Sequence, residues 1–187
     1  FVIACCFMFL LIGLFLDVFR WIFTTFANPR WAEGLDVVPL LALGNIFLGI
    51  YYNLSIWYKL TDKNKMGAII TVAGALITVG LNILLIPKLH YLGAALATFT
   101  CYFFMMITSY IQGQRHYPVP YAVKKITAYL VIVCLFYAIH KLVLYFFPLL
   151  WLGILLGILF IGLFSWLIGW AEKKELQKIP FLQKFIS

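Results

Sequence analysis

The chain of 187 residues has few charged residues: aspartate, glutamate, lysine and arginine make up 11% of it, and only six residues are acidic. By contrast, 65% of the residues are hydrophobic and the mean hydropathy is +1.05. A soluble domain cannot bury that much apolar surface, whereas a membrane protein need not bury it. The alternating pattern of a membrane β-barrel is also lacking. We therefore expect an all-α polytopic membrane protein.

The sequence also lacks the groups that most enzymes and metal sites require. It has no glycine-rich phosphate-binding loop, no paired carboxylates and no serine, histidine and aspartate set with plausible geometry. Its four cysteines lie within apolar runs, without a C-x-x-C pair or a histidine at ligand spacing. We expect them to be reduced packing residues. The chain is therefore predicted not to be an enzyme and to hold no metal or cofactor.

Six apolar runs predict six transmembrane helices, because each has about the 20 residues that cross a hydrocarbon core of about 30 Å. The chain begins inside the first of these runs without an initiator methionine, so we expect it to be a fragment of a longer protein. The predicted spans cover about residues 1–23, 37–58, 67–86, 92–111, 122–145 and 149–170.

The basic residues between the spans predict the orientation in the membrane. Ten lysines and arginines lie in the loops at 59–65 and 115–125 and in the tail at 172–187, whereas Arg20, Arg30, Lys88 and Lys141 lie on the other side. The positive-inside rule places the first group, and with it both ends of the chain, in the cytoplasm. These basic loops explain the net charge of +8, so we expect no nucleic-acid partner.

Three neighbouring spans each carry polar side chains along one face. Polar groups are costly in lipid, so these faces should contact protein or water. For each residue two roles are possible: it lines a substrate cavity, or it only forms a hydrogen bond between helices. The last two spans lack such a stripe and are expected to form a lipid-facing pair outside the others. The candidate cavity residues are Asn45, Tyr52, Asn53, Thr71, Thr78, Asn82 and Tyr102.

The stretch between residues 82 and 98 predicts a very short turn between the third and fourth spans. Pro87 lacks an amide hydrogen and favours extended geometry at Ile86, so the third span should end there. The small residues that begin at Gly93 would let the fourth span pack closely on the third. We expect Pro87, His90 and Gly93 to be structural turn residues.

This turn resembles the C-terminal half of the polysaccharide-biosynthesis (O-antigen type) flippases. Their superfamily includes the lipid II flippase and the multidrug and toxin extrusion antiporters. His90 stands where the family often has glycine, which indicates a left-handed turn residue. The resemblance covers residues 20–115. Its matching positions are Asn82, Leu85, Ile86, Pro87, Gly93, Ala94, Ala95, Ala97 and Thr98, with Trp31, Ala32, Val37, Val38, Pro39, Leu40, Leu41 and Leu43 upstream.

The resemblance implies a fold with two six-helix lobes around a central cavity and an additional helix pair. Residues 1–115 would be the last four helices of the second lobe, and 116–171 the additional pair. Residues 172–187 would be a cytoplasmic amphipathic tail on the inner leaflet, with a frayed solvated tail as the open alternative. The missing N-terminal lobe of the same protein would contain the residues that bind lipid-linked phosphates.

The resemblance also implies a function. It predicts a transporter in the bacterial inner membrane that flips lipid-linked oligosaccharide across the lipid bilayer by alternating access. Two alternatives stay open. One is a cation-coupled multidrug exporter of the same superfamily, and the other is a non-transporting membrane component of a polysaccharide-synthesis complex.

Three further features lie near the ends of the predicted spans. Asp17 and Arg20, which are one helical turn apart, are interpreted as an interfacial ion pair in preference to a coupling-ion site. His140 is likewise interpreted as an interfacial residue. Gly153 and Gly157 form a G-x-x-x-G motif, which predicts where the last span packs on the span before it.

Overall fold

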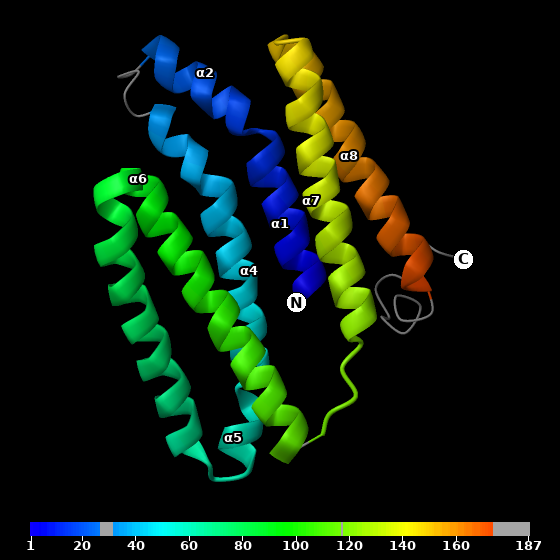
Figure 1. Cartoon of the computed structure of the whole chain (residues 1–187). Coiled ribbons are helices and arrows are strands. Elements are labelled where there is room, and N and C mark those ends of the chain that lie inside the picture. Colours follow the sequence, from blue (N-terminus) through cyan, green and yellow to red (C-terminus); the bar gives the residue numbers. More distant parts are fainter. Residues whose placement is uncertain (27–31, 117, 174–187) are drawn as a thin grey trace.

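The computed structural model describes residues 1–26, 32–116 and 118–173, and the secondary structure in this part is helical (Figure 1). The family position Trp31, the basic residue Arg30 and the predicted tail beyond Lys173 lie outside the described residues. The helices are α1 (Val2–Leu14), α2 (Leu16–Phe26), η1 (Gly34–Val37), α4 (Val38–Leu54), α5 (Ile56–Leu60), α6 (Asn64–His116), α7 (Val123–Phe146) and α8 (Leu150–Ala171).

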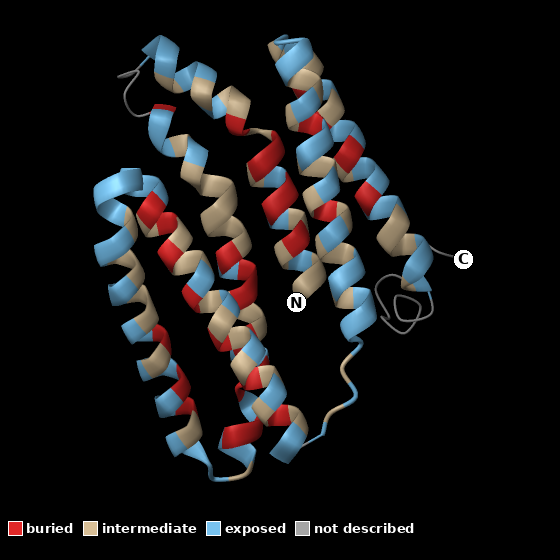
Figure 2. Cartoon of the chain, viewed as in Figure 1, coloured by how far each residue is buried: buried red, intermediate tan, exposed pale blue. Residues whose placement is uncertain are grey.

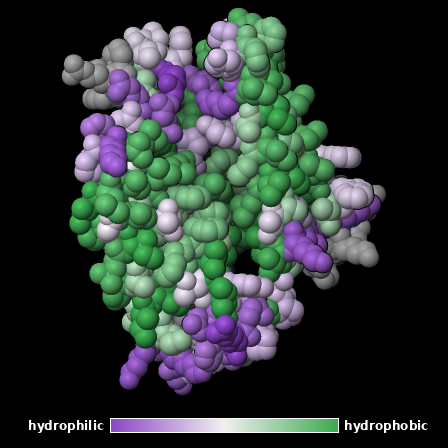
Figure 3. All heavy atoms as spheres, viewed as in Figure 1, coloured by the Kyte–Doolittle hydropathy of each residue, from purple (hydrophilic) through white to green (hydrophobic). Residues whose placement is uncertain are grey.

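Five helical stretches in the described part are long and apolar enough to cross a membrane. Figure 3 shows broad hydrophobic surfaces between hydrophilic zones at the upper left and at the bottom of the molecule. This confirms the expectation of an all-helical protein with several helices able to span a membrane. The stretches are Val2–Phe26, Gly34–Leu60, Asn64–His116, Val123–Phe146 and Leu150–Ala171.

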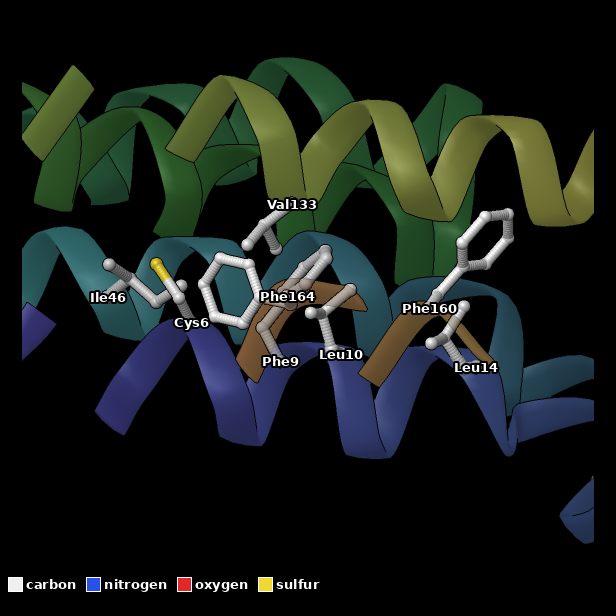
Figure 4. Close-up of a cluster of buried hydrophobic side chains, with 8 residues drawn as sticks. All are labelled: Cys6, Phe9, Leu10, Leu14, Ile46, Val133, Phe160 and Phe164. Carbon is white, nitrogen blue, oxygen red and sulfur yellow. The ribbon is translucent and has the colours of Figure 1, made fainter. Parts of the chain in front are cut away.

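Helix α1 lies at the centre of the packing. Its buried side chains meet α4 on one side and the α7–α8 pair on the other, as Figure 2 shows by the buried residues along facing helices. Apolar side chains from all four helices form the main buried cluster (Figure 4). This cluster contains Cys6, Phe9, Leu10 and Leu14 of α1, Ile46 of α4, Val133 of α7, and Phe160 and Phe164 of α8.

Helix α6 is a hairpin of two arms, residues 64–89 and 91–116, which fold back on each other at His90 (Figure 1). His90 has φ 50° and ψ −126°, which is a positive-φ conformation but not the left-handed helical one. The prediction that Pro87 ends the helix at Ile86 is wrong, because the backbone stays helical as far as His90. Pro87 removes only one amide hydrogen bond, and it does so in the last turn of this arm.

The two arms of α6 meet closely at Gly93. A Cβ atom at this position would lie 2.6 Å from the carbonyl carbon and oxygen of Leu85 and 2.9 Å from the amide nitrogen of Ile86. These are backbone atoms, which cannot rotate away as a side chain would. The hairpin therefore requires a residue without a side chain at Gly93.

Two predicted spans contain breaks that the sequence does not mark. The first is interrupted at Phe15, with φ −97° and ψ 5°, where α1 ends and α2 begins in another direction. The second is interrupted at Ser55, whose hydroxyl donates to the carbonyl oxygen of Tyr52 over 2.6 Å. Side-chain hydrogen bonds of this kind compete with the helical ladder and often bend helices. The predicted boundaries of the last two spans agree with α7 and α8 to within a few residues.

The α7–α8 pair is held together at both its middle and one end. The rings of Phe136 and Phe160 stack with centroids 5.1 Å apart. At the end of α8, Glu172 accepts hydrogen bonds from the Tyr129 hydroxyl over 2.6 Å and from the Lys125 ammonium over 3.1 Å. These donors hold the pKa of Glu172 below its ordinary value.

The first prediction concerns the α6 hairpin. Gly93→Ala should destabilise the protein by about 2 kcal/mol, because the arms must separate to admit the methyl group. The measurement is the midpoint of thermal unfolding in detergent micelles. Gly162→Ala on α8 is the matched control, since nothing lies within 4 Å of its Cβ position. Equal midpoints for the two variants would contradict the packing at Gly93.

The second prediction concerns pH. Because the folded pKa of Glu172 is lowered, its contribution to stability is present above the ordinary pKa and is lost as the pH falls through the folded value. Glu172→Gln should cost about 1 kcal/mol at neutral pH and should flatten the loss of stability toward about pH 4. Thermal unfolding across this range gives the comparison. Glu33→Gln, at an exposed position on another helix, should leave the wild-type profile unchanged.

Candidate functional site

The candidate residues on α4 do not share one cleft. Asn45 is exposed and lines a cleft of about 420 Å³ against α1. Asn53 lines a different cleft of about 510 Å³ between α4, the second arm of α6 and α7. Tyr121 lines this second cleft too, and burial raises its pKa. Tyr52 is 61% exposed and lines neither.

The candidate threonines on α6 are satisfied largely by their own helix. The hydroxyls of Thr71 and Thr78 each donate over 2.9 Å to the carbonyl oxygen four residues earlier. Thr71 also lies 3.3 Å from the hydroxyl of Tyr51, which is itself 3.3 Å from the hydroxyl of Tyr58. This chain of hydroxyls joins α6 to α4 and α5. Tyr51, which sequence analysis did not select, is the buried link.

Asn82 is the candidate whose polar groups are least satisfied. Its side-chain oxygen is buried and has no hydrogen-bond partner in the described part of the chain. A buried acceptor without a partner costs about 1–3 kcal/mol, so such an atom calls for a water molecule or a polar ligand. Tyr102 is half-buried on the second arm, and its ring lies 3.6 Å from the Cβ position of Gly44 on α4.

The arrangement therefore brings Thr71 and Tyr102 to α4, while Asn45 and Asn53 face separate clefts. These residues do not surround one enclosed cavity in the part of the chain that the structure describes. The substrate cavity stays a prediction, and it would need further protein to close it.

A group of charged residues lies at one end of the bundle, with partners that the sequence did not indicate. The Lys141 ammonium on α7 donates to both carboxylate oxygens of Asp17 on α2, over 2.7 and 2.9 Å. Arg20 pairs with Asp36 on η1. The prediction of an ion pair between Asp17 and Arg20 is therefore wrong, because each residue finds a partner on a different helix.

His140 is fully buried between α7 and α8, whereas its depth relative to the membrane interface stays a prediction. Its Nε2 lies 3.1 Å from the carbonyl oxygen of Gly153, while its Nδ1 has no partner in the described residues. The Cβ position of Gly153 lies 3.3 Å from Leu144, so the first glycine of the G-x-x-x-G motif packs on α7, as predicted for the motif. The second glycine, Gly157, faces Leu14 of α1 at 3.5 Å.

A cleft of about 350 Å³ opens beside this charged group, between α2 and the start of α8. Asp17, Arg20, Trp21 and Thr24 line it together with apolar residues. Because Asp17 and Arg20 are each neutralised by a partner, the cluster offers no free charge of either sign. Its clearest role is to tie α2 to α7 and to η1.

No family model, no curated protein and no solved structure matches this chain. The class is therefore defined by the fold alone: a helical protein with several apolar helices able to span a membrane.

The third prediction tests the ion pair between Lys141 and Asp17. Lys141→Met or Asp17→Asn should each cost about 2 kcal/mol, less than the ~3–5 kcal/mol of a fully buried pair, because about a third of each side chain is exposed. The double variant should recover part of this loss, since it leaves no unpaired charge. Thermal unfolding of the four proteins gives the coupling energy. Strictly additive losses would mean that the two residues do not interact.

Proposed function

We propose that this chain is the C-terminal part of a flippase that carries lipid-linked oligosaccharide across the bacterial inner membrane. It would cross the membrane six times, with both ends in the cytoplasm. The reversal of α6 at His90 supports this count, because a straight helix of 53 residues would extend about 80 Å, far beyond the thickness of a bilayer. The two arms each have the length of one crossing.

The observation that carries the proposal is the buried, unpartnered oxygen of Asn82. It lies on an apolar helix that also exposes Thr71 and half-exposes Thr78. In lipid an unsatisfied amide is costly, so this face favours contact with water or with hydroxyl-rich ligands. An oligosaccharide supplies many such hydroxyl donors and acceptors.

In the proposed mechanism, α4 and the two arms of α6 form one wall of a cavity that opens alternately inward and outward. The sugar would pass along Asn45, Tyr52, Asn53, Thr78, Asn82 and Tyr102, while the lipid chain remains in the bilayer. The α7–α8 pair packs on α1, and the start of α7 borders the cleft that Asn53 lines. Closure of the cavity would require the other lobe of the same protein.

The fourth prediction tests the sugar path in the full-length protein. Asn53→Leu and Asn82→Leu should each lower export of the glycan about fivefold, as expected for the loss of a hydrogen bond worth about 1 kcal/mol. Surface glycan is measured in cells that depend on the variant protein. Asn64→Leu, at the exposed start of α6, is the matched control and should export normally. Normal export by all three variants would contradict the proposal.

A further inference from the structure

Two apolar clefts meet on the first turns of α7. The first, of about 510 Å³, includes Phe103 of α6 and Leu130 of α7. The second, of about 520 Å³, is shallower and includes Val131 on a neighbouring face of α7. Val123 and Thr127 line both clefts, so that a ridge of one helical turn separates them. Figure 3 shows a recess between the α6 and α7 sides of the molecule.

A single free lysine stands where the clefts meet. Lys124 directly follows the ridge residue Val123 in the sequence and lines the second cleft. It is exposed and takes part in no ion pair with the described residues, whereas the neighbouring Lys125 binds Glu172 over 3.1 Å. Among the described residues, Lys124 therefore brings an unpaired positive charge to the second cleft, next to the ridge that it shares with the first.

The chemistry of the clefts decides what can fill them. Their walls are mostly aliphatic and aromatic, and the polar side chains of the first cleft are those of Asn53, Tyr110, Tyr121 and Thr127. Both volumes lie in the range of about 300–1,000 Å³ that is typical of clefts for small ligands. Hydrocarbon chains match such walls. Two adjoining clefts with one cation at their junction match a molecule with two chains and one anionic headgroup.

We propose that the start of α7 binds one anionic two-chain phospholipid, with one chain in each cleft and the headgroup phosphate at Lys124. Basic sites between membrane helices on the cytoplasmic side bind anionic headgroups in this way. Tyr110 and Tyr121, whose ring centroids are 6.4 Å apart, line the first cleft and suit headgroup depth. The inference uses the membrane orientation proposed above, but it does not depend on transport of a glycan.

A single-chain lipid would fill only one of the two clefts. The site therefore distinguishes a diacyl phospholipid from a lysolipid with the same headgroup, and it also distinguishes a phosphoglycerol headgroup from a zwitterionic one. Both comparisons can be made with the purified protein in a mild detergent. They do not require the transported substrate, so their outcome is separate from that of the export experiment.

The test is native mass spectrometry with titrated lipids. Phosphatidylglycerol should bind with a stoichiometry of one and about fivefold more tightly than phosphatidylcholine with the same chains, as expected for about 1 kcal/mol from one lysine. Lysophosphatidylglycerol should bind more weakly than phosphatidylglycerol. Equal affinities for phosphatidylglycerol and phosphatidylcholine, or for the diacyl lipid and the lysolipid, would overturn the proposal.

Two variants locate the site. Lys124→Gln should remove the preference for phosphatidylglycerol, whereas Lys173→Gln, an exposed lysine at the end of α8, should retain it. Thr127→Trp should place a large side chain on the ridge and obstruct both clefts, so that the lipid no longer binds. Its thermal midpoint, measured without lipid, should match that of the wild type. Equal effects of the two lysine substitutions would show general surface attraction and would overturn the assignment to Lys124.

Discussion

Close contact between helices at positions without a side chain is the interaction on which this fold depends. Lipid is as apolar as the helices it surrounds, so burial of apolar surface drives their association only weakly. Contact distance then decides which surfaces pack. Gly93 meets the backbone of Leu85, Gly44 lies 3.4 Å from the Cα atom of Phe99 at its Cβ position, and Gly157 faces α1. These contacts fix the α6 hairpin, its position on α4, and the position of α8.

The apolar environment also decides how the polar side chains are paired. At one end of the bundle, charges on α2, η1 and α7 pair across helices, and the pairs Asp17–Lys141 and Arg20–Asp36 leave no free charge among themselves. Further along, α4 and α6 carry uncharged amides and hydroxyls, and among these candidates the buried side-chain oxygen of Asn82 has no partner in the described residues. The first arrangement holds helices together, while the second, under the proposed function, would let this face exchange partners with water or sugar.

Much of the fold could be predicted from hydropathy, because a membrane span needs a long apolar run. The ends of α7 and α8 and the hairpin at His90 follow from this and from local turn chemistry. The break at Phe15, the partner of Asp17 and the burial of His140 could not be predicted. Each depends on contacts between residues that are distant in sequence; Asp17 and Lys141 are 124 positions apart.

The candidate site was predictable only in part. Periodicity identifies which amides and hydroxyls lie near one face of a helix, but it does not identify what that face meets. Asn45 and Asn53 are eight residues apart, which corresponds to a rotation of about 80° around the helix. That rotation is enough to turn one side chain toward α1 and the other toward α7.

The central claim is that one face of α4 and α6 contacts water within the membrane. It is tested most directly by single cysteines at Tyr52, Thr78 and Leu76 in a full-length protein whose native cysteines are replaced by alanine. Leu76 is 69% exposed on an apolar face of α6. A membrane-impermeant maleimide should label the cysteines at positions 52 and 78 but not the cysteine at 76. Protection of all three would contradict the account.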